Sequence, residues 1–174
     1  TLPVDITAGD GNVVIYGGAG GGTIDAGTGG EKSVFAGSGN DRIVLRGGVA
    51  YGTLDGGMGE DTLVLLDNDN MILDLDAMVG KISGIEHIET GLGSKVLIDS
   101  ATLDGLGVTS LTVSGSGSVT VGDGFTDTPA TTFIDSLEYA VYTDSDMNNL
   151  YVFMSLISSG GSFPVLGTLR PPFH

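Results

Sequence analysis

The stretches AGSGNDRIV (residues 36–44) and GGMGEDTLV (residues 56–64) are two copies of one nine-residue phrase. Each copy has a small residue first, glycine second and fourth, aspartate sixth and an aliphatic residue eighth. Glycine permits positive φ angles and lets backbone carbonyl groups converge in a tight turn. The aspartates, Asp41 and Asp61, add an anionic oxygen beside neutral carbonyl oxygens, which is the ligand set that Ca²⁺ prefers. Each copy therefore predicts half of a calcium site followed by a short strand.

The eighth position of the phrase stays aliphatic far beyond these two copies. The residues at this position are Ile6, Ile15, Ile24, Val34, Ile43, Leu54, Leu63 and Ile72. Successive members are nine residues apart, except for one step of ten and one of eleven. A repeat with one inward-pointing aliphatic residue per copy predicts a parallel β-roll or β-solenoid over residues 1–73, with neighbouring coils burying a continuous core.

The three earlier copies lack an aspartate at the sixth position. Val13, Gly22 and Lys32 stand there, and only Lys32 has an acidic neighbour, Glu31. We therefore expect these turns to be glycine-rich corners that hold no full-strength calcium ion.

Composition limits the possible functions of the chain. Its 174 residues include six Lys+Arg and 22 Asp+Glu, for a formal net charge of −16 at pH 7. Such a polyanion repels nucleic acid and anionic membrane surfaces, so neither is an expected partner. No apolar run approaches the roughly 18 residues needed to span a bilayer, so no direct membrane insertion is expected. The absence of cysteine excludes disulfides and Cys-ligated zinc, while the excess of acids is a second indication of bound cations.

The remainder of the chain predicts two further regions. Residues 74–107 are expected to extend the solenoid less regularly and to include one helical turn, with Ser100 as N-cap and Gly105 as its end. Residues 108–174 contain short apolar runs separated by Gly, Asp, Ser and Asn, which predicts antiparallel strands. The expected fold class is all-β: a parallel β-roll or β-solenoid, an irregular solenoid cap and an antiparallel C-terminal region.

The nine-residue phrase resembles the G-G-x-G-x-D-x-U-x repeat of calcium-binding RTX proteins, in which U is aliphatic. The following segments, GIEHIETG (84–91), LTVSG (111–115) and a hairpin around Tyr142, resemble the C-terminal region of large type I-secreted RTX adhesins of Gram-negative bacteria. This resemblance implies Ca²⁺ as cofactor, a secreted or cell-surface location, and an export signal near the C-terminus that an ABC transporter of the type I secretion system reads. Residues 158–174, rich in proline, depart from the acidic and hydrophobic end of that family.

The resemblance also implies which residues bind the metal. In the RTX β-roll, turns alternate between two edges, and a turn shares ions with the next turn on its own edge. The ligands implied for the best site are Gly37, Gly39, Asp41, Gly56, Met58 and Asp61. Those implied for a weaker site are Gly57, Gly59, Asp61 and Asp76, with Asp74 beside them. Further weak candidates are Gly18 and Gly20 with Asp41, and Asp67 and Asp69 on the other edge.

Two classes of function remain open. The favoured one is a non-catalytic, calcium-folded C-terminal module of a surface adhesin, which aids export and extracellular folding. The alternative is the C-terminal RTX part of a secreted enzyme or toxin, such as a protease, lipase or haemolysin, with catalysis upstream. The chain has no H-E-x-x-H and no G-x-S-x-G motif, so we do not expect catalysis within it. Ice or glycan binding is a weaker third possibility, because regular threonine ladders are absent.

Overall fold

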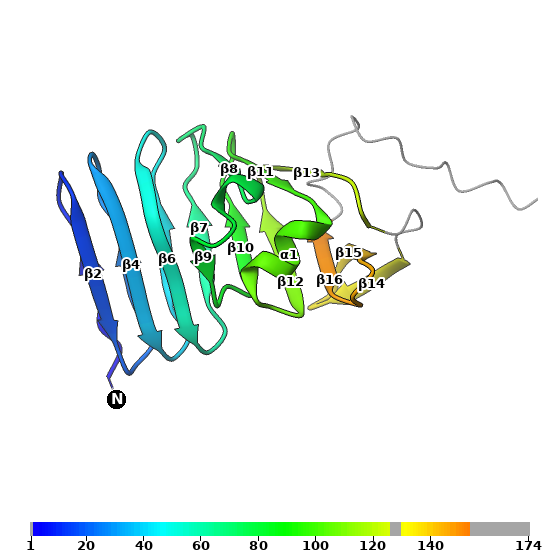
Figure 1. Ribbon diagram of the computed structural model, residues 1–174, viewed down its shortest axis with the longest axis horizontal. Helices are drawn as coiled ribbons and strands as arrows, with labels where there is room; N and C mark the ends of the chain where they lie inside the picture. Colours follow the sequence, from blue (N-terminus) through cyan, green and yellow to red (C-terminus); the bar gives the residue numbers. More distant parts are fainter. Residues whose placement is uncertain (1, 126–129, 154–174) are drawn as a thin grey trace, which may run out of the picture.

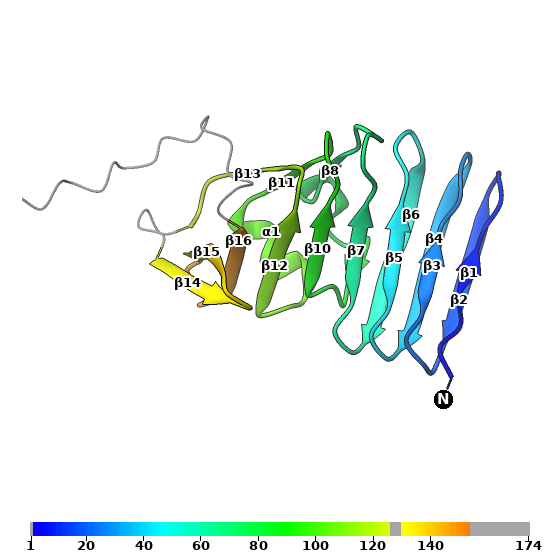
Figure 2. The same ribbon diagram turned by 180° about the vertical axis from the view of Figure 1, so that it is seen from behind.

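The computed structural model describes residues 2–125 and 130–153 as a stack of coils, each built from short strands (Figure 1). The coils form a parallel β-solenoid, and antiparallel strands follow at its C-terminal end (Figure 2). The fold class is therefore the expected one.

Three sheets make up the described residues. The largest sheet consists, in spatial order, of β1 (Ile6–Thr7), β3 (Thr23–Asp25), β5 (Arg42–Leu45), β7 (Thr62–Leu65), β10 (His87–Thr90), β12 (Ser110–Gly115), β16 (Asn149–Phe153), β15 (Leu137–Thr143) and β14 (Ala130–Ile134). The second consists of β2 (Val13–Gly18), β4 (Glu31–Ser38), β6 (Ala50–Met58) and β9 (Ile82–Ser83). The third consists of β8 (Ile72–Asp74), β11 (Lys95–Ile98) and β13 (Ser118–Val121). The helical segments are the 3-10 helix η1 (Asp76–Met78) and α1 (Ser100–Leu106).

The aliphatic eighth position of the phrase forms the core, as its periodicity predicts. In the largest sheet, Ile24, Ile43, Leu63 and Ile88 are aligned on neighbouring parallel strands. Each of these side chains is at most 1% exposed. Because the coils are in register, each new turn covers the aliphatic residue of the previous one.

The predicted position of Ile72 in the core is wrong. Its side chain is 65% exposed, whereas the neighbouring Leu73 is 3% exposed and pairs with Val96. The turn before β8 contains Asn68 and Asn70, both at positive φ. This asparagine turn replaces the glycine corner and shifts the inward face of the strand by one residue, since side chains alternate along a strand.

The solenoid extends further than the sequence predicted. β12 pairs with β10 and β13 pairs with β11, both in parallel, so the expectation of antiparallel strands from residue 108 onward is wrong for these two. Within residues 2–125 and 130–153, antiparallel pairing is confined to β14, β15 and β16. Short alternating runs look alike in both kinds of sheet, because alternation reports burial of one face and not the direction of the neighbour.

The helical turn is confirmed, but its caps differ from the predicted ones. Asp99, not Ser100, is the N-cap: its Oδ1 accepts a hydrogen bond from the Thr102 backbone N–H at 3.0 Å in a capping box. Gly107, at φ 71°, ends the helix. Gly105 lies inside α1, where an added Cβ would come within 2.8 Å of Val79. No helix among the described residues is long and apolar enough to cross a membrane.

Asp99→Ala should lower the free energy of unfolding by about 1 kcal/mol, because the first turn of α1 loses its side-chain acceptor. Urea denaturation followed by circular dichroism measures this loss. Asp146→Ala is the control, since Asp146 is exposed and its side chain makes no hydrogen bond among the described residues. Equal midpoints for the two variants would contradict the assigned capping role.

Candidate metal centre

Successive corners of the solenoid stack on top of one another along two edges. We call one of them the acidic edge; it lies at the lower side of Figure 1 and leads from the second sheet into the largest sheet. Its corners are residues 19–22, 39–41, 59–61 and 84–86. The last residues of these corners are Gly22, Asp41, Asp61 and Glu86. The last residue of each of three consecutive corners is therefore a carboxylate.

These carboxylates form a ladder of hydrogen bonds between coils. Oδ1 of Asp41 accepts from the Gly22 backbone N–H at 2.8 Å, and Oδ1 of Asp61 accepts from the Asp41 N–H at 2.7 Å. Oε2 of Glu86 accepts from the Asp61 N–H at 2.8 Å. Each acid thus accepts a hydrogen bond from the backbone of the preceding coil, and the N–H groups of Asp41 and Asp61 continue the ladder into the next one. Asp41 and Asp61 are almost completely enclosed, with exposed fractions of 3% and 0%.

Asp41 and Asp61 each have a second oxygen without a hydrogen-bond partner. Among the described residues, Oδ2 of Asp41 and Oδ2 of Asp61 are the buried side-chain oxygen or nitrogen atoms without a hydrogen bond. A buried carboxylate with an unsatisfied oxygen is costly unless a proton or a cation neutralises it. These two atoms point to a missing positive charge at the acidic edge.

The electrostatics of the ladder agree with this requirement. Burial raises the pKa of Asp61 to about 6 from an ordinary value of 3.8. The hydrogen bond from the Asp41 N–H opposes this rise, while the charges of Asp41 and Glu86 add to it. Burial also raises the pKa of Asp41, against the hydrogen bond from Gly22. In both aspartates, therefore, the ionised carboxylate is destabilised relative to the protonated form.

Glycine is required where consecutive corners touch. Gly57 lies opposite Gly37 in the parallel register and has φ 93°. A Cβ on Gly57 would lie 2.1 Å from the Gly37 carbonyl oxygen. A Cβ on Gly56 would lie 2.7 Å from Oδ2 of Asp61 and 2.0 Å from the Gly84 carbonyl oxygen. Backbone carbonyls and the unpartnered carboxylate oxygen are thus brought close together because side chains are absent.

The residues predicted for the best site lie in adjacent coils. Gly39 donates its N–H to the Met58 carbonyl oxygen at 2.8 Å, and a Cβ on Gly59 would lie 2.3 Å from the Gly39 carbonyl oxygen. The Met58 side chain itself is 75% exposed, so only its backbone belongs to the corner. The stacking that the phrase predicts for Gly37, Gly39 and Asp41 on the next copy is present.

Asp76, predicted as a ligand of the weaker site, does not lie in a corner of the acidic edge. It begins η1, directly after β8, and β8 pairs with β11 in the third sheet. The strand that continues the acidic edge is β9, which pairs with β6, and the acid beside Asp61 is therefore Glu86. Sequence reasoning missed Glu86 because η1 interrupts the nine-residue period. Its signal was the short phrase SGIE at residues 83–86, which follows a buried isoleucine.

The donor set suits a hard cation. No group of three or more His, Cys, Asp or Glu side chains in the described part of the chain could hold a metal ion. A cation at the acidic edge would therefore take most of its ligands from backbone carbonyls and add one or two carboxylates. Ca²⁺ accepts such mixed oxygen sets of six to eight ligands, whereas Zn²⁺ prefers His and Cys.

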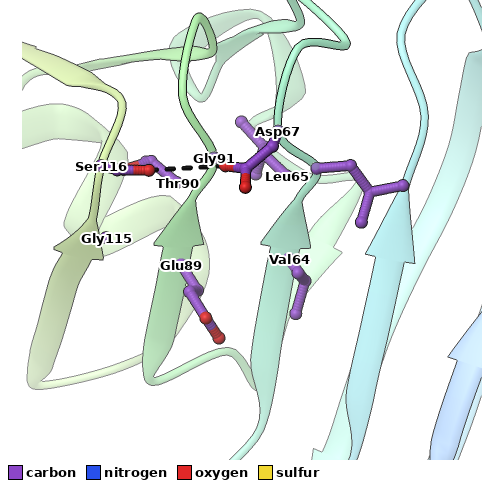
Figure 3. A pocket seen from close by; sticks show the side chains of 9 residues that line it. Val64, Leu65, Asp67, Glu89, Thr90, Gly91, Gly115 and Ser116 are labelled. Atoms are coloured by element: carbon purple, nitrogen blue, oxygen red, sulfur yellow. Dashed lines mark hydrogen bonds between the residues drawn. The ribbon is translucent and has the colours of Figure 1, made fainter.

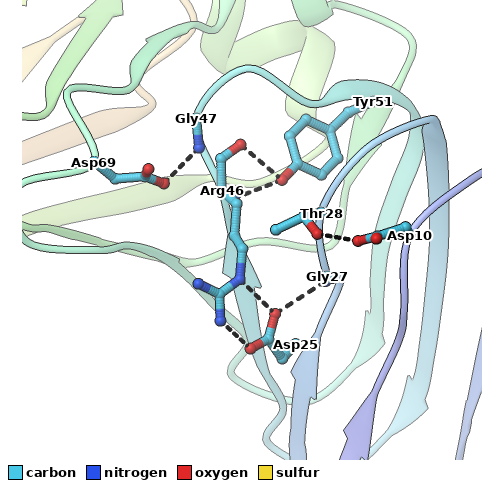
Figure 4. Close-up of polar contacts among 8 residues, drawn as sticks. All are labelled: Asp10, Asp25, Gly27, Thr28, Arg46, Gly47, Tyr51 and Asp69. Carbon is cyan, nitrogen blue, oxygen red and sulfur yellow. Dashed lines mark hydrogen bonds and ion pairs between the residues drawn. The ribbon is translucent and has the colours of Figure 1, made fainter.

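The opposite edge is built differently (Figure 4). Its corners are residues 8–12, 26–30, 46–49, 66–71 and 91–94. Here Asp25 is paired with the Arg46 guanidinium, with Nε donating to Oδ1 at 3.0 Å, and this hydrogen bond lowers the pKa of Asp25. Asp69 accepts from the Gly47 N–H, and Asp67 accepts from the Leu92 N–H at 2.7 Å. Asp67 is exposed and Asp69 is half-buried, so these weak candidates lack the enclosed, unpartnered oxygens of the acidic edge.

A groove of about 330 Å³ lies at the ends of β7 and β10 (Figure 3). Asp67, Glu89, Thr90 and Ser116 contribute polar groups to its lining. Ser116 Oγ donates to Asp67 Oδ1 at 3.4 Å, and Thr90 Oγ1 donates to the Ser114 carbonyl oxygen at 2.9 Å. These hydrogen bonds connect different coils, and the carboxylate of Glu89 is paired with Arg42.

Comparison of the chain with models of protein families, with curated proteins and with solved structures gave no match. The resemblance to RTX proteins therefore rests on the quoted residues, and the fold rests on the strand pairing.

Proposed function

We propose that this chain is a calcium-binding module that becomes fully stable only when it meets Ca²⁺ outside the cell. The observation that carries the proposal is the pair of buried aspartates, Asp41 and Asp61, each with one unpartnered oxygen in a glycine corner. The module is assigned to the C-terminal part of a type I-secreted RTX surface adhesin. That assignment, and export by an ABC transporter, are supported by the sequence resemblance alone.

The residues that would hold the ion are those of the stacked corners on the acidic edge. The carboxylates of Asp41 and Asp61 would supply negative charge, and the backbone carbonyls of Gly37, Gly39 and Met58 would supply neutral oxygens. Bound Ca²⁺ would neutralise the enclosed carboxylates and join consecutive coils. Glu86 extends the same acidic column by one coil, so its carboxylate is a further candidate ligand on the far side of Asp61.

The affinity expected for such a site would leave it largely empty inside the cell and filled outside it. Extracellular Ca²⁺ modules bind with dissociation constants of about 10⁻⁴ to 10⁻³ M, so their sites are largely empty at the low free Ca²⁺ of a cytoplasm. At a hundredfold excess over the dissociation constant, each site adds about 2.7 kcal/mol to the free energy of unfolding. Before export, the uncompensated acidic edge and the net charge of −16 would keep the chain less stable.

Calcium should raise the melting temperature of the purified chain by about 5 to 10 °C per site, at a hundredfold excess over the dissociation constant. Circular dichroism melting in CaCl₂, compared with NaCl plus EGTA at matched ionic strength, measures this shift. Isothermal titration in the same buffers counts the ions. Identical melting curves and no binding heat would refute the proposed function, because simple screening of the net charge is equal in both buffers.

A further inference from the structure

One cationic side chain is enclosed in the opposite edge. Lys32 stands at the sixth position of its phrase, where Asp41 and Asp61 stand in the later copies, and its exposed fraction is 0%. Its Nζ donates to the carbonyl oxygen of Gly9 at 2.6 Å and to that of Gly11 at 2.8 Å. No carboxylate lies within 4.0 Å of this ammonium among the described residues. The positive charge is therefore held by backbone carbonyls.

The two carbonyls belong to the glycines at the second and fourth positions of residues 8–16, the previous copy on the same edge. The parallel register places Val13, the sixth residue of that copy, beside Lys32. The Lys32 side chain thus reaches back over the corner formed by residues 8–12. A buried ammonium is costly without compensating ligands, and converging carbonyl oxygens are the ligands that a hard cation would also use.

We propose that the corner formed by residues 8–12 is a cation-binding cradle whose permanent occupant is the Lys32 ammonium. This corner closes without metal, and a carboxylate in place of the ammonium would turn it into a site for a divalent cation with oxygen preference, such as Ca²⁺. The inference goes beyond the proposed function and holds whether or not the acidic edge binds Ca²⁺.

The two edges of the solenoid thus carry buried side chains of opposite charge at the sixth position of the phrase. On the acidic edge the sixth residue is an anion whose second oxygen lacks a partner. On the opposite edge the sixth residue, Lys32, is itself a cation. In the next coil of that edge, Tyr51 pairs with Lys32, and its hydroxyl accepts a hydrogen bond from the Arg46 backbone N–H at 2.6 Å. The N-terminal corners of this edge are consequently closed by side chains of the chain itself.

Lys32→Asp tests the cradle directly, with Lys81→Asp as the control. Lys81 is exposed, so its substitution makes the same change in net charge without altering the corner. Isothermal titration should count one more Ca²⁺ per chain for Lys32→Asp than for the wild type, and no additional ion for Lys81→Asp. A Lys32→Asp chain that folds only in Ca²⁺ also supports the cradle. Equal ion counts in the two variants would overturn the cradle. A Lys32→Asp chain that folds neither in CaCl₂ nor in EGTA would also overturn it.

Lys32→Met, measured in EGTA, tests the role of the ammonium without calcium. The variant keeps the apolar stem but leaves the Gly9 and Gly11 carbonyls unpaired, so its melting temperature should fall by about 5 °C relative to Lys81→Met. Equal melting temperatures would overturn the inference, whereas a larger loss or failure to fold agrees with it. If the wild type binds no Ca²⁺ while Lys32→Asp does, the proposed function fails and the cradle stands. If the wild type binds Ca²⁺ and Lys32→Asp binds no additional ion, the cradle fails and the proposed function stands.

Discussion

Gly57→Ala should lower the free energy of unfolding by about 4 kcal/mol or more. The new Cβ would lie 2.1 Å from the carbonyl oxygen of Gly37, which is backbone in the centre of the stacked corners and cannot turn away. The backbone at Gly57 also has φ 93°, a conformation that alanine adopts only with strain of about 1 to 3 kcal/mol. Both effects act on the acidic edge.

Gly80→Ala is the matched control for this substitution. Gly80 has φ 76°, also in the left-handed region, but a Cβ there would meet no atom within 4 Å. The control therefore suffers the backbone strain without the collision, and urea denaturation should find it clearly more stable than Gly57→Ala. Equal losses for the two variants would show that strain alone matters and that the corners can move apart.

Asp61→Asn should stabilise the calcium-free chain at neutral pH, an unusual result for a buried residue. A carboxylate whose pKa is raised in the folded state, here from 3.8 to about 6, binds its proton more tightly in that state. Its contribution to stability is fully present below the unfolded pKa and is lost as the pH rises through about 6. The shift corresponds to about 3 kcal/mol, and asparagine, which does not ionise, avoids the loss.

The measurement compares Asp61→Asn with the wild type by urea denaturation between pH 4 and pH 7 in calcium-free buffer. The advantage of the variant should grow with pH over this window, while the exposed control Asp146→Asn shows no such trend. In saturating Ca²⁺ at pH 7 the order should reverse, because the variant has lost a charged ligand. A variant that remains the more stable protein in Ca²⁺ would show that no ion is bound through Asp61.

Much of the fold could be predicted from the sequence because a solenoid is governed by local periodicity. The aliphatic column from Ile24 to Leu63 follows directly from the nine-residue spacing. The prediction failed at Ile72, where a turn at positive φ shifted the strand face, and for β12, whose parallel partner is set by long-range stacking. The direction of β12 leaves no mark on the alternation of apolar and polar residues, whereas the shift at Ile72 does, since Leu73 and Leu75 alternate with Asp74 and Asp76.

The candidate site could be predicted only in part for a related reason. Asp41 and Asp61 share one phase of the phrase, so their neighbouring positions on one edge follow from the repeat. Glu86 follows an interruption of the period, and its contact with Asp61 depends on β9 rejoining the second sheet. Lys32 at the sixth position indicated that this copy lacks an anion. The contact of its side chain with the previous coil could not be predicted without the three-dimensional register.

The carboxylate ladder has a mechanical consequence. Hydrogen bonds between parallel strands run across the strands, so those between coils lie roughly along the long axis of the stack. Tension between the two ends would load these bonds one coil at a time and peel the stack open. The links from Gly22 through Asp41 and Asp61 to Glu86 lie in that same direction and tie four consecutive coils together. Under load, peeling should therefore pause in this part of the stack.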